Sequence, residues 1–262
     1  MPVLRTTSLL DISLAAVTYD DVVELVNHAL AEPTSGGLTI DAINTMGVSE
    51  ACLDQRMGEA LRGYDLLLPD GMPLVWYMNA KGAGLGGRVY GPYVTDQLLT
   101  ALERPTRVAL IGGFDEVHKW LRRVGPSRYP NAEFTLLYDA PGGPIDDAYV
   151  LECVERVRRS GAELIFVCLG VPRQYYWTAL AREHLDGRVC ISVGGAFDLV
   201  AGLQPYAPAW MQRAGLTWFH RLIREPRRLA GRYVKYNSVF LWLLLTRELV
   251  PRRLTRPRHR AP

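Results

Sequence analysis

One carboxylate interrupts a very apolar stretch of the chain, "LLLPDGMPLV" (66–75). The three leucines predict a buried strand that ends at Pro69, and the apolar residues after Gly71 predict a helix. Asp70 therefore stands where a strand gives way to a helix. A carboxylate at that position can cap the helix, or it can act as a general base that takes a proton from a hydroxyl group. The spacing alone leaves both roles open.

Other predicted strands also end in glycines or polar residues. Gly112–Gly113 and Gly194–Gly195 each lie between a strand and a helix, where free backbone N–H groups can meet a phosphate. Asp198 follows one turn into the second of these helices. The alternatives are tight packing of helix against strand for the glycines and an interaction with the helix dipole for Asp198. Asn44, Tyr138–Asp139 and Gly170 also stand at strand ends, and Gln174 lies at the start of the helix after Gly170.

The elements that must position these residues alternate along residues 1–204. Short β-rich runs span 38–44, 64–69, 107–113, 133–139, 163–170 and 188–195, with helical-length segments between most of them. This order predicts an α/β catalytic domain, with a mostly parallel, Rossmann-like sheet and helices on both faces. Ligands bind beyond the carboxyl ends of the strands in such sheets, so we expect the polar strand ends to gather along one edge.

The composition changes at about residue 205. From there on the chain holds 13 Lys or Arg and only 2 acidic residues, whereas the preceding part has a net charge of −8. We predict a basic, aromatic, helical appendage over 205–250, interrupted at Pro226 and near Asn237–Ser238, and a disordered basic tail over 251–262. The apolar run 239–245 is too short to span a bilayer, which needs about 20 residues. A helix on an anionic membrane surface fits this composition; packing on the body or an oligomer contact is the alternative.

Several classes of chemistry find no support in the sequence. The 5 histidines and 4 cysteines show no zinc-ligand spacing, and no nucleophile elbow or Walker loop occurs. The glycine run 82–87 follows a predicted helix rather than a strand, so we do not expect a dinucleotide there. No Asp-x-Asp pair is present, and we expect neither a metal nor a cofactor. The scattered cysteines favour a reducing compartment, and the acidic N-terminal stretch is unlike an export signal.

Four motifs resemble the WecG/TagA/CpsF family of bacterial glycosyltransferases: "LLLPDGMPLV", "LGVPRQYYW", "VGGAFDLVAG" and "APAWMQRAGLTWFHRLIREPRRLAGRY". The likeness runs from residue 10 to about residue 245. It implies that a sugar passes from a UDP-sugar to an undecaprenyl-diphosphate-linked glycan, with inversion and without a metal ion. It also implies a cytoplasmic enzyme attached peripherally to the inner face of the cytoplasmic membrane.

The resemblance also implies roles for individual residues. Asp70 matches the proposed general base, and Gly71 would allow close approach of the substrate. Arg88 would stabilise the departing diphosphate together with N–H groups near the paired glycines, and Asp198 would bind the nucleotide or brace the site. Asn44 and Gln174 would orient sugar and acceptor. The appendage would meet the lipid diphosphate and the membrane through Arg221, Arg224, Arg227, Arg228 and Trp218, with Arg221, Arg224 and Arg228 on one helical face if Pro226 does not break the helix.

The chain departs from the family pattern where donor or acceptor would be read. Ala42 replaces a threonine, Arg173 and Tyr175 alter a Pro-Lys-Gln-Glu motif, and Pro92 follows Gly91 where Gly-Thr-Asp is usual. The sugar therefore stays open, as does self-association into a homo-oligomer. A non-catalytic nucleotide- or lipid-binding module of a polysaccharide assembly complex is the alternative function. The acidic body and the apolar appendage argue against a nucleic-acid partner.

Overall fold

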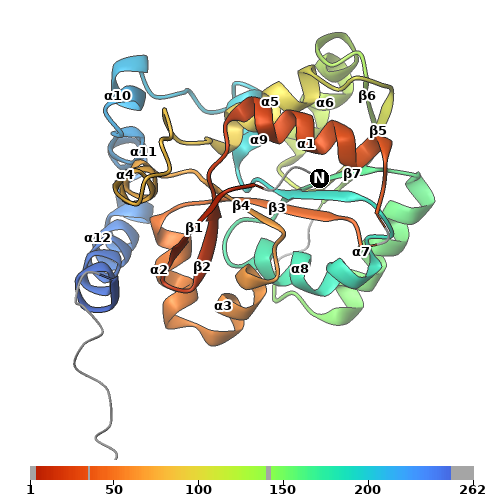
Figure 1. Cartoon of the computed structure of the whole chain (residues 1–262). Coiled ribbons are helices and arrows are strands. Elements are labelled where there is room, and N and C mark those ends of the chain that lie inside the picture. Colours follow the sequence, from red (N-terminus) through yellow and green to blue (C-terminus); the bar gives the residue numbers. More distant parts are fainter. Residues whose placement is uncertain (1–3, 35, 140–142, 249–262) are drawn as a thin grey trace, which may run out of the picture.

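The computed structural model describes residues 4–34, 36–139 and 143–248 and is built on one parallel sheet (Figure 1). Six strands lie in the order β4-β3-β8-β7-β5-β6. Their bounds are β3 Leu38–Ile43, β4 Leu66–Pro69, β5 Thr106–Gly112, β6 Ala132–Tyr138, β7 Leu164–Cys168 and β8 Val189–Ser192. All pairs are parallel, so every carboxyl end meets the same edge. The predicted α/β architecture is confirmed.

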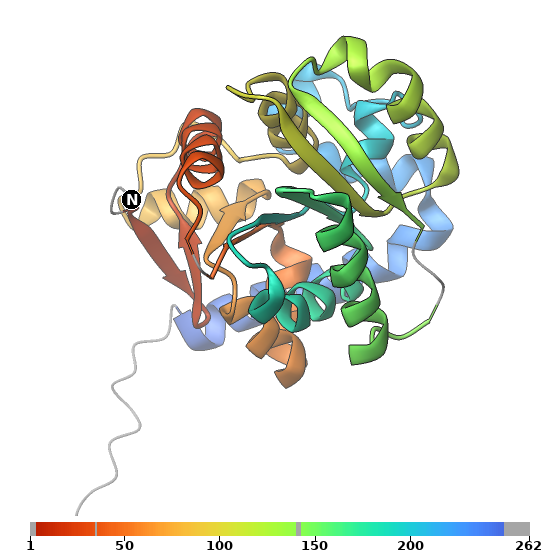
Figure 2. The same ribbon diagram turned by 90° about the vertical axis from the view of Figure 1, so that its right-hand side faces the viewer.

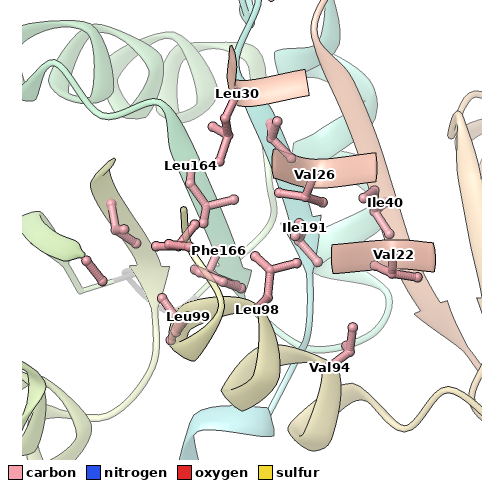
Figure 3. Close-up of a cluster of buried hydrophobic side chains, with 14 of the residues drawn as sticks. Val22, Val26, Leu30, Ile40, Val94, Leu98, Leu99, Leu164, Phe166 and Ile191 are labelled. Atoms are coloured by element: carbon pink, nitrogen blue, oxygen red, sulfur yellow. The ribbon is translucent and has the colours of Figure 1, made fainter. Parts of the chain in front are cut away.

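One face of the sheet is covered by four helices. They are α1 (Tyr19–Ala31), α5 (Gly91–Thr100), α6 (Asp115–Arg128) and α9 (Ala196–Val200). Figure 3 shows how the apolar stripes of α1 and α5 meet the strands: Val26 and Leu98 lie over Phe166 and Ile191. The spacing of Val22, Val26 and Leu30 places one side of α1 against the sheet. Burial of this apolar surface is the main force that holds the layer on the sheet.

The other face carries the remaining helices of the body (Figure 2). Here lie α2 (Thr45–Leu53), α3 (Gln55–Arg62), α7 (Asp147–Ser160) and α8 (Arg173–Ala181), followed by the short η1 (Arg182–His184). Their buried side chains form two clusters, one around Met57 and Leu61 and the other around Trp177. Helix α4 (Met72–Ala80) packs into the first cluster through Leu74 and Met78.

The sequence analysis missed an N-terminal hairpin. Strands β1 (Thr6–Leu9) and β2 (Ile12–Ala15) pair antiparallel, and Leu9 and Ile12 are buried in the cluster that contains Met57. The two turn residues, Leu10 and Asp11, adopt left-handed conformations with φ of 51° and 62°. No Asn-Gly or Asp-Gly pair marks this turn in the sequence, so its usual signal is missing.

The C-terminal appendage is packed against the body rather than separate from it. It contains α10 (Ala209–Arg213), α11 (Thr217–Arg224), α12 (Pro226–Leu243) and a last π-helical turn, η2 (Leu244–Glu248). Figure 1 shows α12 beside α2, where the Ser49 hydroxyl donates to the Tyr236 carbonyl at 3.0 Å. Phe240 and Leu243 are buried in the same cluster as Met57.

One prediction about the appendage was wrong, the interruption near Asn237–Ser238. Helix α12 runs without a break through Asn237–Ser238. The interruption at Pro226 does occur, because Glu225 leaves the helical conformation with φ of −131° and Pro226 begins the next helix. Arg221 and Arg224 therefore lie on α11 and Arg228 lies on α12, so the three arginines do not share one helical face. The predicted tail, 251–262, lies outside the described residues.

Candidate active site

Asp70 lies at the carboxyl end of β4, directly before α4. The N-cap of that helix is Gly71, and no side chain caps it, so Asp70 is not the cap. Its side chain is only 16% exposed, and Oδ1 accepts no hydrogen bond from the described residues. Burial raises the pKa of Asp70 to about 7, an effect that Arg88, the Gly91 N–H and Arg221 oppose. A carboxylate with such a pKa is suited to taking up a proton near neutral pH.

Arg88 is the nearest cation to this carboxylate. Its Nη1 lies 3.8 Å from Asp70 Oδ1, and its guanidinium stacks over the Tyr90 ring at 4.1 Å. Nη2 donates to the Thr217 hydroxyl at 2.7 Å. Thr217 is the first residue of α11, so the appendage fixes the orientation of an arginine at the active site.

A cavity of about 280 Å³ opens beside this cluster. Tyr90 and Thr217 line it together with His220, Arg221, Arg224 and Glu225. Arg221 lowers the pKa of Asp70 and also that of Asp198, although burial raises both overall. The cavity thus combines arginine side chains with an apolar wall, which is the composition expected of a pocket for a phosphorylated ligand.

Asn44 follows β3 and caps the next helix. Its Oδ1 accepts from the backbone N–H groups of Met46 and Gly47, at 3.0 and 3.2 Å. Gly71 packs beside it, since a Cβ on Gly71 would lie 3.8 Å from the Asn44 Cα. Both predicted residues are therefore neighbours of Asp70. Asn44 has a structural role as a helix cap, and its predicted contact with the substrate stays a prediction.

Gln174 is buried on the first turn of α8. Its Nε2 donates to Asp41 Oδ1 at 2.8 Å, whereas Oε1 accepts no hydrogen bond from the described part of the chain. Asp41 is fully buried in β3, and burial raises its pKa to about 8. The sequence analysis missed Asp41, although a charged residue inside the apolar run "LTIDAI" is itself a signal.

The turn after β8 lies between the Gln174 amide and the Asp198 carboxyl. Gly194 adopts a φ of 53°, and a Cβ on it would lie 3.4 Å from Gln174 Oε1. A Cβ on Gly195 would lie 3.3 Å from Asp198 Oδ2. Asp198 is buried on α9, and Arg221 is the cation that acts on it most strongly. These residues lie at the same carboxyl edge of the sheet as Asp70, and their predicted contacts with the substrate stay predictions.

Gly112, Gly113 and Tyr138 lie at the opposite end of the same edge. Strand β5 is four strand spacings from β4, or roughly 19 Å at about 4.8 Å per spacing. The carbonyl of Gly112 accepts from His118 Nε2 at 2.9 Å. Tyr138 stacks on Tyr149, with ring centroids 6.4 Å apart. The structure thus does not bring these three predicted residues to Asp70.

The remaining appendage residues face solvent. Arg227 and Arg228 are exposed, and Arg228 pairs with Glu225. Trp218 is 43% exposed and packs edge-on against Tyr233 at 6.0 Å. Of the predicted arginines, only Arg221 and Arg224 line the cavity.

Two residues of this site were not predicted from the sequence. Tyr90 lies in a segment with no motif of its own. Thr217 lies inside the appendage motif, but nothing in that motif indicates a contact with Arg88, and only the fold brings both residues to it. Within the described ranges no group of three or more His, Cys, Asp or Glu side chains could hold a metal ion.

Comparison with known proteins identifies the family. Residues 7–254 match the model of the Glycosyl transferase WecG/TagA/CpsF family. The chain belongs to this family. It is therefore a glycosyltransferase, and the family resemblance drawn from its motifs is confirmed.

Three relatives of this chain share one name. The chain is 30% identical to an N-acetylglucosaminyldiphosphoundecaprenol N-acetyl-beta-D-mannosaminyltransferase of Bacillus subtilis (strain 168), covering 73% of each chain. A protein of the same name from Bacillus spizizenii is 29% identical over 68% of each chain. A third, from Staphylococcus aureus (strain MRSA252), is 25% identical over 89% of this chain and 90% of its own length.

Proposed function

We propose that this glycosyltransferase moves a sugar from a UDP-sugar to an undecaprenyl-diphosphate-linked acceptor, with inversion and without a metal ion, in the synthesis of a bacterial surface polysaccharide. The single observation that carries the proposal is Asp70: a nearly buried carboxylate at a strand end, with one oxygen that accepts no hydrogen bond from the described residues. The names of the relatives support the lipid-linked acceptor and the class of reaction.

The chemistry follows from the arrangement. The acceptor hydroxyl oxygen attacks the anomeric carbon of the donor while Asp70 takes the hydroxyl proton. The bond from that carbon to the diphosphate breaks, and UDP leaves with the electron pair. The relatives are named for a β-linked product, and UDP-sugars of this kind are α-linked, so a single displacement with inversion accounts for the product.

Positive charge for the departing diphosphate comes from arginines in this proposal. Arg88 and Arg221 are the two cations that act on the Asp70 carboxylate, and Arg221 also lines the cavity. Arginine forms paired hydrogen bonds with phosphate oxygens, so two such side chains can offset the charge that develops as UDP departs.

The decisive test is turnover. We would incubate the purified protein with a panel of UDP-sugars and a synthetic polyprenyl-diphosphate N-acetylglucosamine, with and without EDTA, and assign the product anomer by NMR. One UDP-sugar should give a β-linked product at an unchanged rate in EDTA. Release of UDP without a glycosylated lipid, or an α-linked product, would contradict the proposal.

The appendage supports attachment to the inner face of the cytoplasmic membrane. Trp210, Trp218, Ile223 and Trp242 are between 43% and 61% exposed on α10, α11 and α12, among exposed arginines. Apolar rings beside cations are the composition of a surface that binds anionic lipid. Across the residues that the structure describes, no helix has both the length and the apolarity to cross a bilayer.

A matched pair of variants tests this attachment. Replacing Trp218, Ile223 and Trp242 together by serine should reduce binding to phosphatidylglycerol vesicles about tenfold or more in a sedimentation assay, because each exposed apolar side chain adds to the affinity. Replacement of Phe114, which is also exposed (65%) but lies at the start of α6, is the control. An equal loss of vesicle binding in both variants would mean that the appendage does not make the membrane contact.

A further inference from the structure

Two buried oxygens on adjacent side chains accept no hydrogen bond from the described residues. They are Asp41 Oδ2 and Gln174 Oε1, and the two side chains are joined by the hydrogen bond from Gln174 Nε2 to Asp41 Oδ1. Asp41 is 0% and Gln174 is 4% exposed. Buried polar atoms almost always find a partner in a folded protein, so the unpaired Gln174 Oε1, next to the carboxyl edge of the sheet, calls for one.

Asp41 fixes the orientation of the Gln174 amide. Asp41 Oδ1 accepts from the NH₂ end of the amide at 2.8 Å, and this bond turns the carbonyl end of the amide away from Asp41. The Gln174 oxygen then faces Gly194, where a Cβ would lie only 3.4 Å away. Glycine at that position leaves room beside the oxygen, at the carboxyl edge of the sheet.

We infer that Asp41 is a positioning residue that presents Gln174 Oε1 to the substrate as a hydrogen-bond acceptor, so that the group read there is a hydroxyl or an amide N–H of the transferred sugar. This inference rests on the proposed transfer of a sugar from a UDP-sugar. It restricts the substrate, because a carboxylate or phosphate oxygen cannot donate a hydrogen bond to Gln174. Asp41 itself lies below the surface and acts only through the glutamine.

A double-mutant cycle tests the link between the two residues. Asp41→Leu keeps the approximate shape and removes the acceptor, and Gln174→Ala removes the amide. Each should lower kcat/KM about tenfold, mostly through KM for the donor, and the double variant should be no worse than Gln174→Ala alone. Asp41→Asn keeps an acceptor but allows the amide to rotate, so we expect a smaller loss of about threefold. That loss should also disappear in the Gln174→Ala background.

Tyr64→Phe is the matched control. The Tyr64 hydroxyl lies in the same buried layer and bonds to the Ser192 hydroxyl at 2.8 Å, but it does not contact Gln174. Its kcat/KM should change less than twofold. If Asp41→Leu fails to fold, as judged by its melting temperature, the Asp41→Asn cycle gives the answer. Losses that multiply in the double variant, or full activity in Gln174→Ala, would overturn the inference.

Deoxy and deacetamido analogues of the best UDP-sugar identify the group that is read. One of them should be about tenfold worse than the parent donor for the wild-type protein and equal to it for Gln174→Ala. Identical discrimination by both proteins at every position would overturn the sugar-reading role. A failure of the proposed function looks different, because the wild-type protein itself would then not turn over. The cycle is in that case read from UDP-sugar affinity by calorimetry, with the same non-additivity expected.

Discussion

At the β4 end of the sheet, Asp70 keeps one oxygen without a hydrogen-bond donor among the described residues, whereas at the β6 end His118 has an oxygen partner for each ring nitrogen. Its Nδ1 lies 3.0 Å from Asp139 Oδ1 and its Nε2 lies 2.9 Å from the Gly112 carbonyl. Both ends carry a buried titratable side chain beside a strand terminus. A buried oxygen without a donor costs stability and can accept a hydrogen bond from a ligand, while a side chain with a partner for each polar atom holds a turn in place.

The largest effect should come from the unsatisfied end. Asp70→Asn removes the base and keeps the shape, so kcat should fall about 10²- to 10⁴-fold. UDP affinity should stay within about threefold when measured by calorimetry, because the amide does not alter the arginines around the cavity. Normal turnover in Asp70→Asn would mean that Asp70 is not the base, and the two ends of the sheet edge would then not differ in catalytic role.

The pH dependence of kcat/KM also tests Asp70 as the base. A base must be ionised to act, and burial raises the pKa of Asp70 to about 7, so kcat/KM should rise with pH and level off above about pH 7. Below that value it should fall about tenfold for each pH unit. Stopped assays in constant-ionic-strength buffers give the profile. A flat profile from pH 5 to 8 would mean that Asp70 is not the titrating base.

A third prediction concerns the hydroxyl that ties the appendage to Arg88. Thr217→Val removes the acceptor for Arg88 Nη2 and keeps the shape, so kcat should fall about tenfold, as expected for loss of a hydrogen bond to a charged group. Thr217→Ser retains the hydroxyl and should restore most of the rate. Equal losses in both variants would attribute the effect to packing at the start of α11.

The smallest effect on activity should come from the β6 end of the sheet, where His118 has a partner for each ring nitrogen. A change there should lower stability instead. His118→Phe leaves the Gly112 carbonyl without its donor, so the free energy of unfolding should drop by about 1–3 kcal/mol while kcat/KM changes less than about threefold. Chemical denaturation measures the first quantity. Loss of turnover in the folded variant would make the β5–β6 end part of the active site.

Asp70→Asn should change the stability in the opposite direction to His118→Phe. Burial raises the pKa of Asp70 from 3.8 to about 7, so the folded protein binds a proton that the unfolded chain releases between about pH 4 and pH 7. The wild-type protein therefore loses stability as pH rises through that window. The variant avoids this loss and should be more stable at pH 8 by about 4 kcal/mol, with no difference below about pH 4.

Much of the architecture could be predicted because its signals are local. Runs such as "ELIFVCLG" are apolar enough to require burial on both faces, and all six predicted core strands appear within a few residues of their expected bounds. Asp70 was found in the same way, since a charge after three leucines is conspicuous. The β1–β2 hairpin was missed because its turn, Leu10–Asp11, uses no glycine.

The rest of the site depends on contacts between distant segments. Thr217 reaches Arg88 across 129 positions of sequence, and Gln174 reaches Asp41 across 133; neither pair has a spacing that a motif can express. The distance of Tyr138 and Gly112 from Asp70 was also hidden. Strand ends share an edge in any parallel sheet, but only the strand order shows which of them are neighbours.

The way the last helices are fastened has a consequence for protein engineering. Glu248 accepts from the Leu10 backbone N–H at 2.8 Å and from the Tyr77 hydroxyl at 2.7 Å, so the end of the appendage is tied to the N-terminal hairpin. A chimera that exchanges only the appendage between relatives would break these bonds and the seam between α2 and α12. A functional exchange would have to carry the hairpin and α2 along with it.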